Sequence, residues 1–130
     1  LKIKKWPLKS WVNLANLIGE DYEIIIIGGP SEIEEAKYIK SRTKNSYNFC
    51  NKFSISELFF VFKNSQIAIS NDTGAMHLCD ATGTIVIGLF STKELSPKWY
   101  PNNKKAIVIE DNDSIANISP TKVYNVIKSF

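Results

Sequence analysis

The sequence has 130 residues, 44% of them hydrophobic and 22% charged, which fits one globular domain and argues against a disordered chain. The formal net charge of +3 suits a phosphate-bearing ligand or weak contact with an anionic membrane, and is too small to indicate a nucleic-acid-binding protein. No apolar run approaches the roughly 20 residues that cross a bilayer, and Cys50, Cys79 and the single histidine form no zinc-binding pattern. We expect two reduced, buried thiols and no metal.

The first half of the sequence predicts helices and strands in alternation. Ser10 stands before a helical apolar periodicity and is expected to cap a helix that Gly19 ends. Glu23–Ile27 contains four consecutive isoleucines, which is typical of a parallel strand buried on both faces. Ser31 and Glu34 then have the spacing of a capping box, which predicts the start of a second helix.

The rest of the sequence continues this alternation. Ser54 and Glu57 form a second capping box, and Ser119 is expected to cap a last helix with Pro120 at its first position. The other expected elements are strands at Leu1–Ile3, Tyr47–Cys50, Gln66–Ser70, Ile85–Phe90 and Ala106–Ile109, and a helix at Thr73–Thr82 that Gly83 ends. This pattern predicts an α/β fold, a parallel sheet with helices on both faces.

Ligands of such folds bind beyond the carboxyl ends of the strands. Stretches that follow predicted strands should therefore meet at one edge of the sheet. They are Lys4–Pro7, Gly28–Ser31, Asn71–His77 and Ser91–Trp99. Ser91–Lys105 is a long irregular stretch, which in a compact domain suggests a working loop.

The segment Asn71–His77 lies between a predicted strand and a predicted helix. The start of a helix offers unpaired N–H groups and a partial positive charge, which suit a phosphate. Gly74 allows a ligand to approach the backbone closely, and the Asp72 carboxylate is able to accept hydrogen bonds from sugar hydroxyls. Judged alone, Asp72 or Thr73 is as readily a simple helix cap, and His77 a half-buried structural histidine.

The wider run from Ser70 to Pro101 resembles the ADP-heptose:lipopolysaccharide heptosyltransferases. The carboxyl-terminal half of that family carries D-[ST]-G-x-x-H-L, followed later by a Trp-containing loop. Further similar segments are K-x-W-P at Lys4–Pro7, G-G-x-x-E at Gly28–Glu32, S-[IL]-x-E-L at Ser54–Leu58 and the terminal helix at Ser119–Val123. The sequence departs from the family pattern at Ile85, where Pro is usual, and at Ser91, where the F-G-x-T turn has Gly.

The resemblance implies the GT-B architecture, in which two Rossmann-like domains face a cleft. Residues 1–130 match the carboxyl-terminal, nucleotide-sugar-binding domain, and the amino-terminal acceptor domain is expected to be absent from this chain. The implied reaction transfers heptose from ADP-heptose to the lipopolysaccharide core, inverts the anomeric centre and needs no metal or cofactor. The catalytic base is expected in the absent domain, so this chain should hold no catalytic residue and be inactive alone.

The resemblance also implies the partners and the location of the protein. The partners are a nucleotide-diphospho-sugar donor and, through the missing domain, the lipopolysaccharide core acceptor; no nucleic acid is expected. The expected location is the cytoplasm, with peripheral contact with the cytoplasmic face of the inner membrane as an option.

The donor-binding residues implied by the family motifs lie at strand ends and helix starts. They are Lys4 for the donor phosphates, Asp72 for the hydroxyls of the donor sugar, Thr73 and Gly74 for a phosphate at the helix start, His77 for orienting the site, Glu32 for the ribose hydroxyls, and the stretch around Phe53 for the base.

From the residues alone, these assignments have structural alternatives. Lys4 and Lys5 are equally well read as solvated lysines, Glu32 as an acidic residue favoured in a first helical turn, and Phe53 as a core residue. Trp99 and Tyr100 fit either a ligand cover or an anchor of their loop.

Two rival functions remain open at this point. The parent protein could transfer another sugar from another nucleotide in capsule or O-antigen synthesis, or the chain could be a non-catalytic Rossmann-like nucleotide-binding module. No G-x-G-x-x-G follows the strand at Ile24–Ile27, so the sequence does not support a dinucleotide-dependent dehydrogenase.

Overall fold

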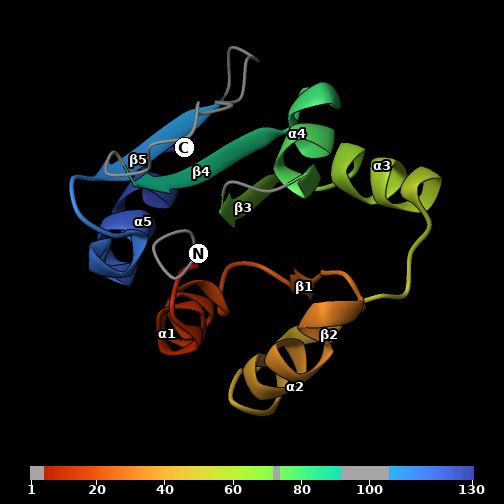
Figure 1. The fold of residues 1–130 in the computed structure, drawn as a ribbon, viewed down its shortest axis with the longest axis horizontal. Helices are drawn as coiled ribbons and strands as arrows, with labels where there is room; N and C mark the ends of the chain where they lie inside the picture. Colours follow the sequence, from red (N-terminus) through yellow and green to blue (C-terminus); the bar gives the residue numbers. More distant parts are fainter. Residues whose placement is uncertain (1–4, 72–73, 92–105) are drawn as a thin grey trace. The chain divides into compact units, whose positions relative to one another are not determined.

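The computed structural model describes residues 5–71, 74–91 and 106–130, and of Gly74 and Ala75 only the backbone. Helices and strands alternate along the chain (Figure 1). Their bounds are α1 Leu8–Ile18, β1 Ile24–Ile26, the 3-10 turn η2 Pro30–Glu32, α2 Ile33–Ser41, β2 Ser46–Asn48, α3 Ile55–Lys63, β3 Ile67–Asn71, α4 Gly74–Ala81, β4 Ile85–Ser91, β5 Ile107–Asp111, the 3-10 turn η3 Ile115–Asn117 and α5 Pro120–Lys128.

The chain divides into two compact units. The β1–β2 unit comprises residues 7–53 and 119–130, and the β3–β5 unit comprises residues 1–6 and 54–118. Both units contain parallel strands and packed helices, so the predicted α/β class is confirmed. No helix in the described part of the chain is long and apolar enough to cross a membrane.

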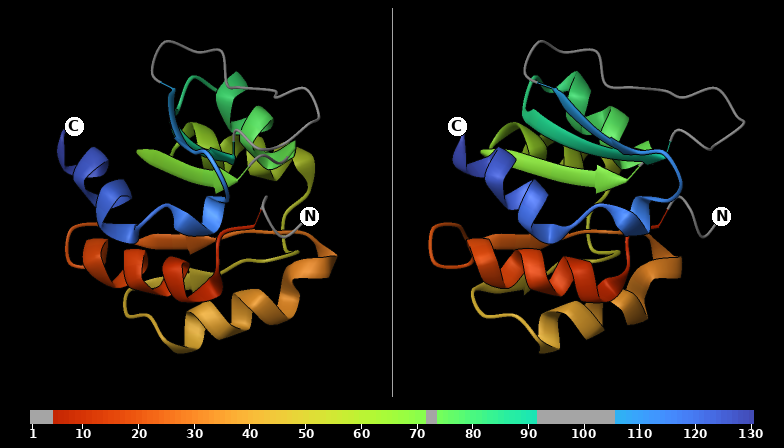
Figure 2. Two further views of the ribbon diagram at one scale, coloured as in Figure 1. Left: turned by 60° about the vertical axis from the view of Figure 1, so that its left-hand side comes forward. Right: turned by 90° about the vertical axis from the view of Figure 1, so that its left-hand side faces the viewer.

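In the β1–β2 unit, strands β1 and β2 pair in parallel, with Ile25 opposite Tyr47. Helix α2 packs on β2, and α1 packs on both α2 and α5, as Figure 2 shows for α1 and α5. The prediction that the isoleucine run is buried on both faces was wrong. Ile25 is 45% exposed and Tyr47 is 46% exposed, because the described helices of this unit leave that face of the pair open.

Two of the predicted helix starts in this unit were also wrong. Helix α1 begins at Leu8, and the Pro7 carbonyl accepts hydrogen bonds from the N–H groups of Ser10 (2.9 Å) and Trp11 (3.2 Å). Ser10 therefore lies inside the first turn, and Pro7, whose ψ of 145° is not helical, takes the N-cap position. Helix α1 ends at Ile18, directly before Gly19, as predicted. Gly19 has a φ of −64°, so it ends the helix without the left-handed conformation that is common for glycine at this position.

The predicted Ser31–Glu34 capping box is replaced by a contact two residues earlier, between Gly29 and Glu32. Pro30 starts the 3-10 turn η2, and the Glu32 carboxylate reaches back to the N–H of Gly29. Helix α2 then continues from Ile33. Ser31 makes no such cap because Pro30, with its fixed φ, begins the helical turn before Ser31 is reached.

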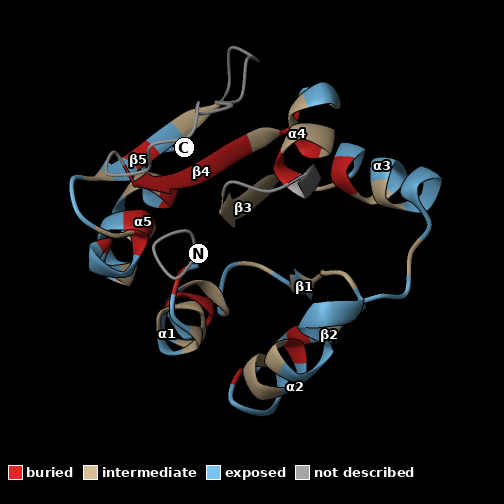
Figure 3. Ribbon diagram, viewed as in Figure 1, coloured by how far each residue is buried: buried red, intermediate tan, exposed pale blue. Residues whose placement is uncertain are grey.

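The β3–β5 unit is built on three parallel strands in the order β3-β4-β5. The central strand β4 is buried along nearly its whole length, as Figure 3 shows. Gly88 lies on β4 beneath helix α4: a Cβ atom there would stand 3.0 Å from the Met76 sulfur and 2.8 Å from Phe90 Cε2. The missing side chain of Gly88 therefore lets Met76, which is fully buried, pack α4 directly onto the sheet.

The predicted cap of helix α3 is confirmed. Ser54 Oγ accepts from Glu57 N (3.2 Å), and Glu57 Oε1 accepts from Ser54 N (2.9 Å). The hydrogen bond from Ser54 N lowers the pKa of the Glu57 carboxyl, because it stabilises the charged form. Gly83, with a φ of +78°, follows helix α4 as predicted.

The predicted start of the last helix is confirmed as well. Ser119 Oγ accepts from Lys122 N at 3.1 Å, and Pro120 is the first residue of α5. Within the β3–β5 unit, the Trp6 indole Nε1 donates to the Ile118 carbonyl at 2.8 Å, and the Trp6 side chain is buried. This bond joins two segments that are 112 residues apart in the sequence.

Candidate functional site

The turn that follows β1 places the Glu32 carboxylate at the carboxyl end of that strand. Glu32 Oε1 accepts a hydrogen bond from Gly29 N at 3.1 Å. Gly28 leaves room for this arrangement, because a Cβ on Gly28 would lie 3.3 Å from Glu32 Oε2 and 3.2 Å from Cys50 Sγ. The carboxylate is thus held in one orientation by the backbone, and it retains lone pairs for other donors.

The turn that follows β2 is bonded to the same strand end. Phe49 N donates to the Ile26 carbonyl (2.9 Å), and Asn51 N donates to the Gly28 carbonyl (2.8 Å). Asn51 has a φ of +58°, a left-handed conformation that Asn adopts more readily than most residues. Because the turns after β1 and β2 share these bonds, the structure brings Phe49, Cys50 and Glu32 to one edge of the β1–β2 unit.

Phe53 ends this turn and lies against Phe49. The two ring centroids are 5.2 Å apart and the ring planes differ by 25°, an offset stacked pair. Phe49 is 39% exposed and Phe53 is half-buried, so neither ring is a core residue. The family motifs single out Glu32 and Phe53, and the structure places Phe49 beside Phe53; the only sequence signal for Phe49 is a second phenylalanine on the other side of the Asn51-Lys52 turn.

The Cys50 thiol belongs to this edge but is not equipped to act as a nucleophile. Burial raises the pKa of Cys50, and the negative charges of Glu32 and Glu35 raise it further. Its Sγ donates to the Gly29 carbonyl at 3.5 Å. The thiol therefore stays protonated and contributes packing and a weak hydrogen bond.

In the β3–β5 unit, the predicted ligand segment begins where the fold places a strand end beside a helix start. Asn71 is the last residue of β3, opposite Leu89 of β4, and helix α4 begins at Gly74. The Asn71 Oδ1 atom is buried and has no hydrogen-bond partner in the described part of the chain. A buried acceptor without a partner is costly, so a donor brought by a ligand would stabilise this strand end.

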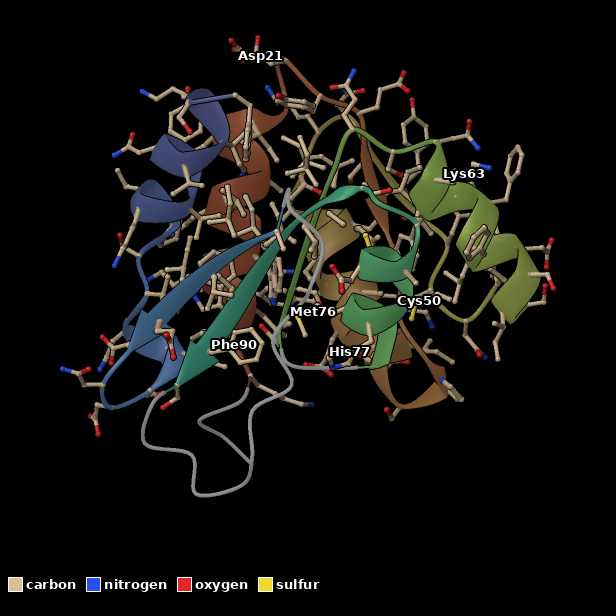
Figure 4. The ribbon with its side chains drawn as sticks, turned by 90° about the horizontal axis from the view of Figure 1, so that it is seen from above. Asp21, Cys50, Lys63, Met76, His77 and Phe90 are labelled. Carbon is tan, nitrogen blue, oxygen red and sulfur yellow. The ribbon has the colours of Figure 1, made fainter. Side chains whose placement is uncertain are left out.

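His77 lies one turn into α4 and is half-buried, next to the buried Met76 (Figure 4). The structure therefore brings Gly74 and His77 together on the first turn of one helix, as the motif predicts. Lys4, Asp72 and Thr73 lie outside the described residues, as do Trp99 and Tyr100.

Both cysteines are buried and neither forms a disulfide, which confirms the prediction of buried, unbridged thiols. Burial, assisted by the charge of Asp80, raises the pKa of Cys79 to about 11. Cys79 faces the packed side of α4, so it lies away from solvent on the helix that carries His77.

The arrangement of these strand ends can be compared with known proteins. The family model "Glycosyltransferase family 9 (heptosyltransferase)" matches residues 2–125 of the chain. A comparison with curated proteins found no significant match.

Several solved structures are similar to this fold. They include Escherichia coli ADP-heptose lps heptosyltransferase II (TM-score 0.85, 22% identity, 98% of this chain and 42% of that chain covered). A glycosyl transferase family 9 protein from Veillonella parvula DSM 2008 gives a TM-score of 0.88 at 22% identity, over 99% of this chain and 42% of that chain. The structure of E. coli heptosyltransferase WaaC with ADP gives a TM-score of 0.86 at 22% identity, over 99% of this chain and 41% of that chain.

The chain thus spans about 42% of the length of the first two relatives. At this level of identity the structural likeness shows the fold, and the shared fold is one half of a GT-B heptosyltransferase. The family itself is shown by the sequence match over residues 2–125. The chain belongs to glycosyltransferase family 9, the heptosyltransferases.

Proposed function

We propose that this chain is the donor-binding domain of a metal-independent, inverting glycosyltransferase that transfers heptose from ADP-heptose to the lipopolysaccharide core. The family match over residues 2–125 carries this proposal. Similar structures that contain ADP or ADP-2-deoxy-2-fluoro heptose support an adenine nucleotide sugar as the donor.

In this proposal the edge of the β1–β2 unit binds the nucleoside. Glu32 receives the ribose hydroxyls, because its carboxylate is already oriented by Gly29 N and still has lone pairs to offer. Hydrogen bonds to a charged acceptor contribute about 1.5–3 kcal/mol each. The base lies at the stretch around Phe53.

The diphosphate and sugar bind at the start of α4. The first N–H groups of a helix have no partner within the helix, and Gly74 opens α4 without a side chain that would obstruct a phosphate. By the family motifs, Lys4 and Thr73 add contacts to the phosphates, Asp72 receives hydroxyls of the sugar, and His77 orients the site. Without a metal, these groups must stabilise the departing diphosphate.

The acceptor and the catalytic base belong to an amino-terminal domain. The relatives are more than twice as long as the part that this chain covers, which leaves room for such a domain in a complete enzyme. With a lipid-linked acceptor, the enzyme works in the cytoplasm and contacts the inner membrane peripherally. Donor binding and sugar transfer therefore depend on different domains, so donor binding can be measured without transfer.

Calorimetry of the 130-residue chain tests the proposal. We expect ADP to bind more tightly than UDP or GDP, and we expect no transfer of heptose by the chain alone. Equal or reversed base preference would favour another nucleotide sugar, as in capsule or O-antigen synthesis. Nucleotide binding that yields no transfer even after the chain is joined to an acceptor domain would favour a non-catalytic binding module.

A further inference from the structure

We propose that Phe49 is a specificity-determining residue of the donor site, and that its ring, stacked on Phe53, forms an aromatic platform that selects a purine base over a pyrimidine. The inference rests on the proposed function, because it places the nucleoside at the edge of the β1–β2 unit. Phe49 lies outside the family motifs that implicate Glu32 and the stretch around Phe53.

The first support is that the stacked rings of Phe49 and Phe53 are only partly buried, although aromatic side chains usually pack away from water. The Phe49 and Phe53 rings are stacked at 5.2 Å, yet Phe49 remains 39% exposed. A stacked pair presents a broader apolar surface than a single ring does. Aromatic rings stack on nucleobases whatever the sequence, and a two-ring purine covers more of such a surface than a one-ring pyrimidine.

The second support is that the turn holding Phe49 is fixed in place. Phe49 N is bonded to the Ile26 carbonyl, Cys50 N to Asn48 Oδ1 at 3.0 Å, and Asn51 N to the Gly28 carbonyl. An exposed ring on a rigid backbone binds a flat ligand at a lower entropic cost than a ring on a free loop.

The third support is the position of Phe49 relative to a group suited to ribose. Phe49 adjoins Cys50, and both Cys50 Sγ and Glu32 Oε2 lie within 3.3 Å of the point where a Gly28 Cβ would stand. The Cys50 thiol and the Glu32 carboxylate thus flank the same glycine, and Phe49 is the residue before Cys50 in that turn. A strand-end region that offers both an aromatic ring and a carboxylate suits a nucleoside, since its base stacks on aromatic rings and its ribose hydroxyls donate hydrogen bonds to an acceptor.

Binding of three ligands to matched variants tests the inference. The ligands are ADP, UDP and inorganic pyrophosphate, and calorimetry gives each dissociation constant. We expect Phe49→Ala to weaken ADP binding on the order of tenfold, as the loss of one base stack would. UDP binding should weaken less, and pyrophosphate binding should stay unchanged. Phe49→Tyr should restore the ADP affinity, because it restores the ring.

Tyr47→Ala is the matched control. Tyr47 is 46% exposed and lies within β2, two residues from Phe49 and further from the strand end. This variant removes a similar exposed ring, so it should leave all three affinities unchanged. If Phe49→Ala fails to fold, Phe49→Leu keeps an apolar side chain and should show the same loss of preference for ADP over UDP.

The outcomes separate this inference from the proposed function. If the unmodified chain binds ADP but Phe49→Ala weakens all three ligands equally, or none, the role of Phe49 is overturned and the proposed function stands. If Tyr47→Ala causes the same loss, Phe49 acts through the stability of the strand, which also overturns the inference. If the unmodified chain does not bind ADP, the proposed function and the inference fail together.

Discussion

The Glu32 carboxylate is held by the backbone N–H of Gly29, with 3.1 Å between Oε1 and N. A single hydrogen bond thus joins the second glycine of the turn after β1 to the acid that is expected to meet the ribose. The bond orients one carboxylate oxygen and leaves the other, Oε2, near Gly28. Substitution of Glu32 therefore separates its local structural role from its role toward a ligand.

Glu32→Gln should preserve the fold and weaken nucleotide binding. The amide oxygen of Gln is still able to accept from Gly29 N, so the melting temperature should change little. The loss of charge should lower ADP affinity about tenfold, in line with roughly 1.5–3 kcal/mol for a charge-assisted bond. Affinity for 2′-deoxy-ADP should fall much less, because that ligand lacks one of the hydroxyls. An equal loss for both nucleotides in calorimetry would contradict the assignment to ribose.

Asp72→Asn should separate a helix cap from a sugar ligand. Asn caps helices about as well as Asp, so the melting temperature should stay almost unchanged. ADP affinity should remain roughly intact, since a carboxylate beside a diphosphate would repel it. In a complete two-domain enzyme the transfer rate should fall, because a charged acceptor of hydroxyl hydrogen bonds is lost. Normal transfer would leave Asp72 as a cap only.

Gly88→Ala should destabilise the β3–β5 unit. The new Cβ would meet Met76 Sδ at 3.0 Å and Phe90 Cε2 at 2.8 Å, so helix α4 or the Phe90 ring must move (Figure 4). Overpacking of this kind costs about 1–3 kcal/mol in the free energy of unfolding. Gly83→Ala is a comparison for a different cause of instability: its Cβ would meet nothing within 4 Å, so any loss there comes from the φ of +78° and not from overpacking. Urea unfolding that finds Gly88→Ala no less stable than the parent would refute the packing argument.

Cys79 should react slowly with thiol reagents at neutral pH. Its pKa of about 11 leaves little thiolate below pH 9, and its side chain is buried. Since the folded pKa is raised above the reference value of 9.0, the protonated thiol favours the folded state at low pH. That contribution is complete below pH 9 and is lost as the pH rises through about 11. Rapid labelling of native Cys79 at pH 7, followed by mass spectrometry with Cys79→Ser as control, would contradict its burial.

Elements with strong local signals could be predicted from the sequence. The Ser54–Glu57 box and the Ser119-Pro120 start depend only on residues within one turn, and both were placed correctly. The Ser31–Glu34 box had the same kind of signal and was wrong. Pro30, one residue earlier, starts the turn first and leaves Gly29 N for Glu32.

Features that depend on distant neighbours were harder to predict. Four isoleucines in a row predict a strand, but they do not say whether a helix will cover the face that carries Ile25. The periodicity of the sequence likewise could not predict the Phe49–Phe53 stack, because the two rings meet across an irregular turn in which Asn51 has a left-handed conformation. The family motifs point to Glu32 and Phe53 as donor-binding residues, whereas the position of Phe49 beside Phe53 is visible only in the folded turn.

The bond between Trp6 and the Ile118 carbonyl has a consequence for biosynthesis. Each unit combines residues from both ends of the chain: Trp6 with Ile118 in one, and α1 with α5 in the other. A ribosome releases the chain from the amino-terminal side onward, so the β3–β5 unit lacks Ile118 and the β1–β2 unit lacks α5 until those residues have been made. Until then the emerging chain must keep the apolar faces of α1 and β4 out of contact with other proteins. Termination before Ile118 would leave both units incomplete.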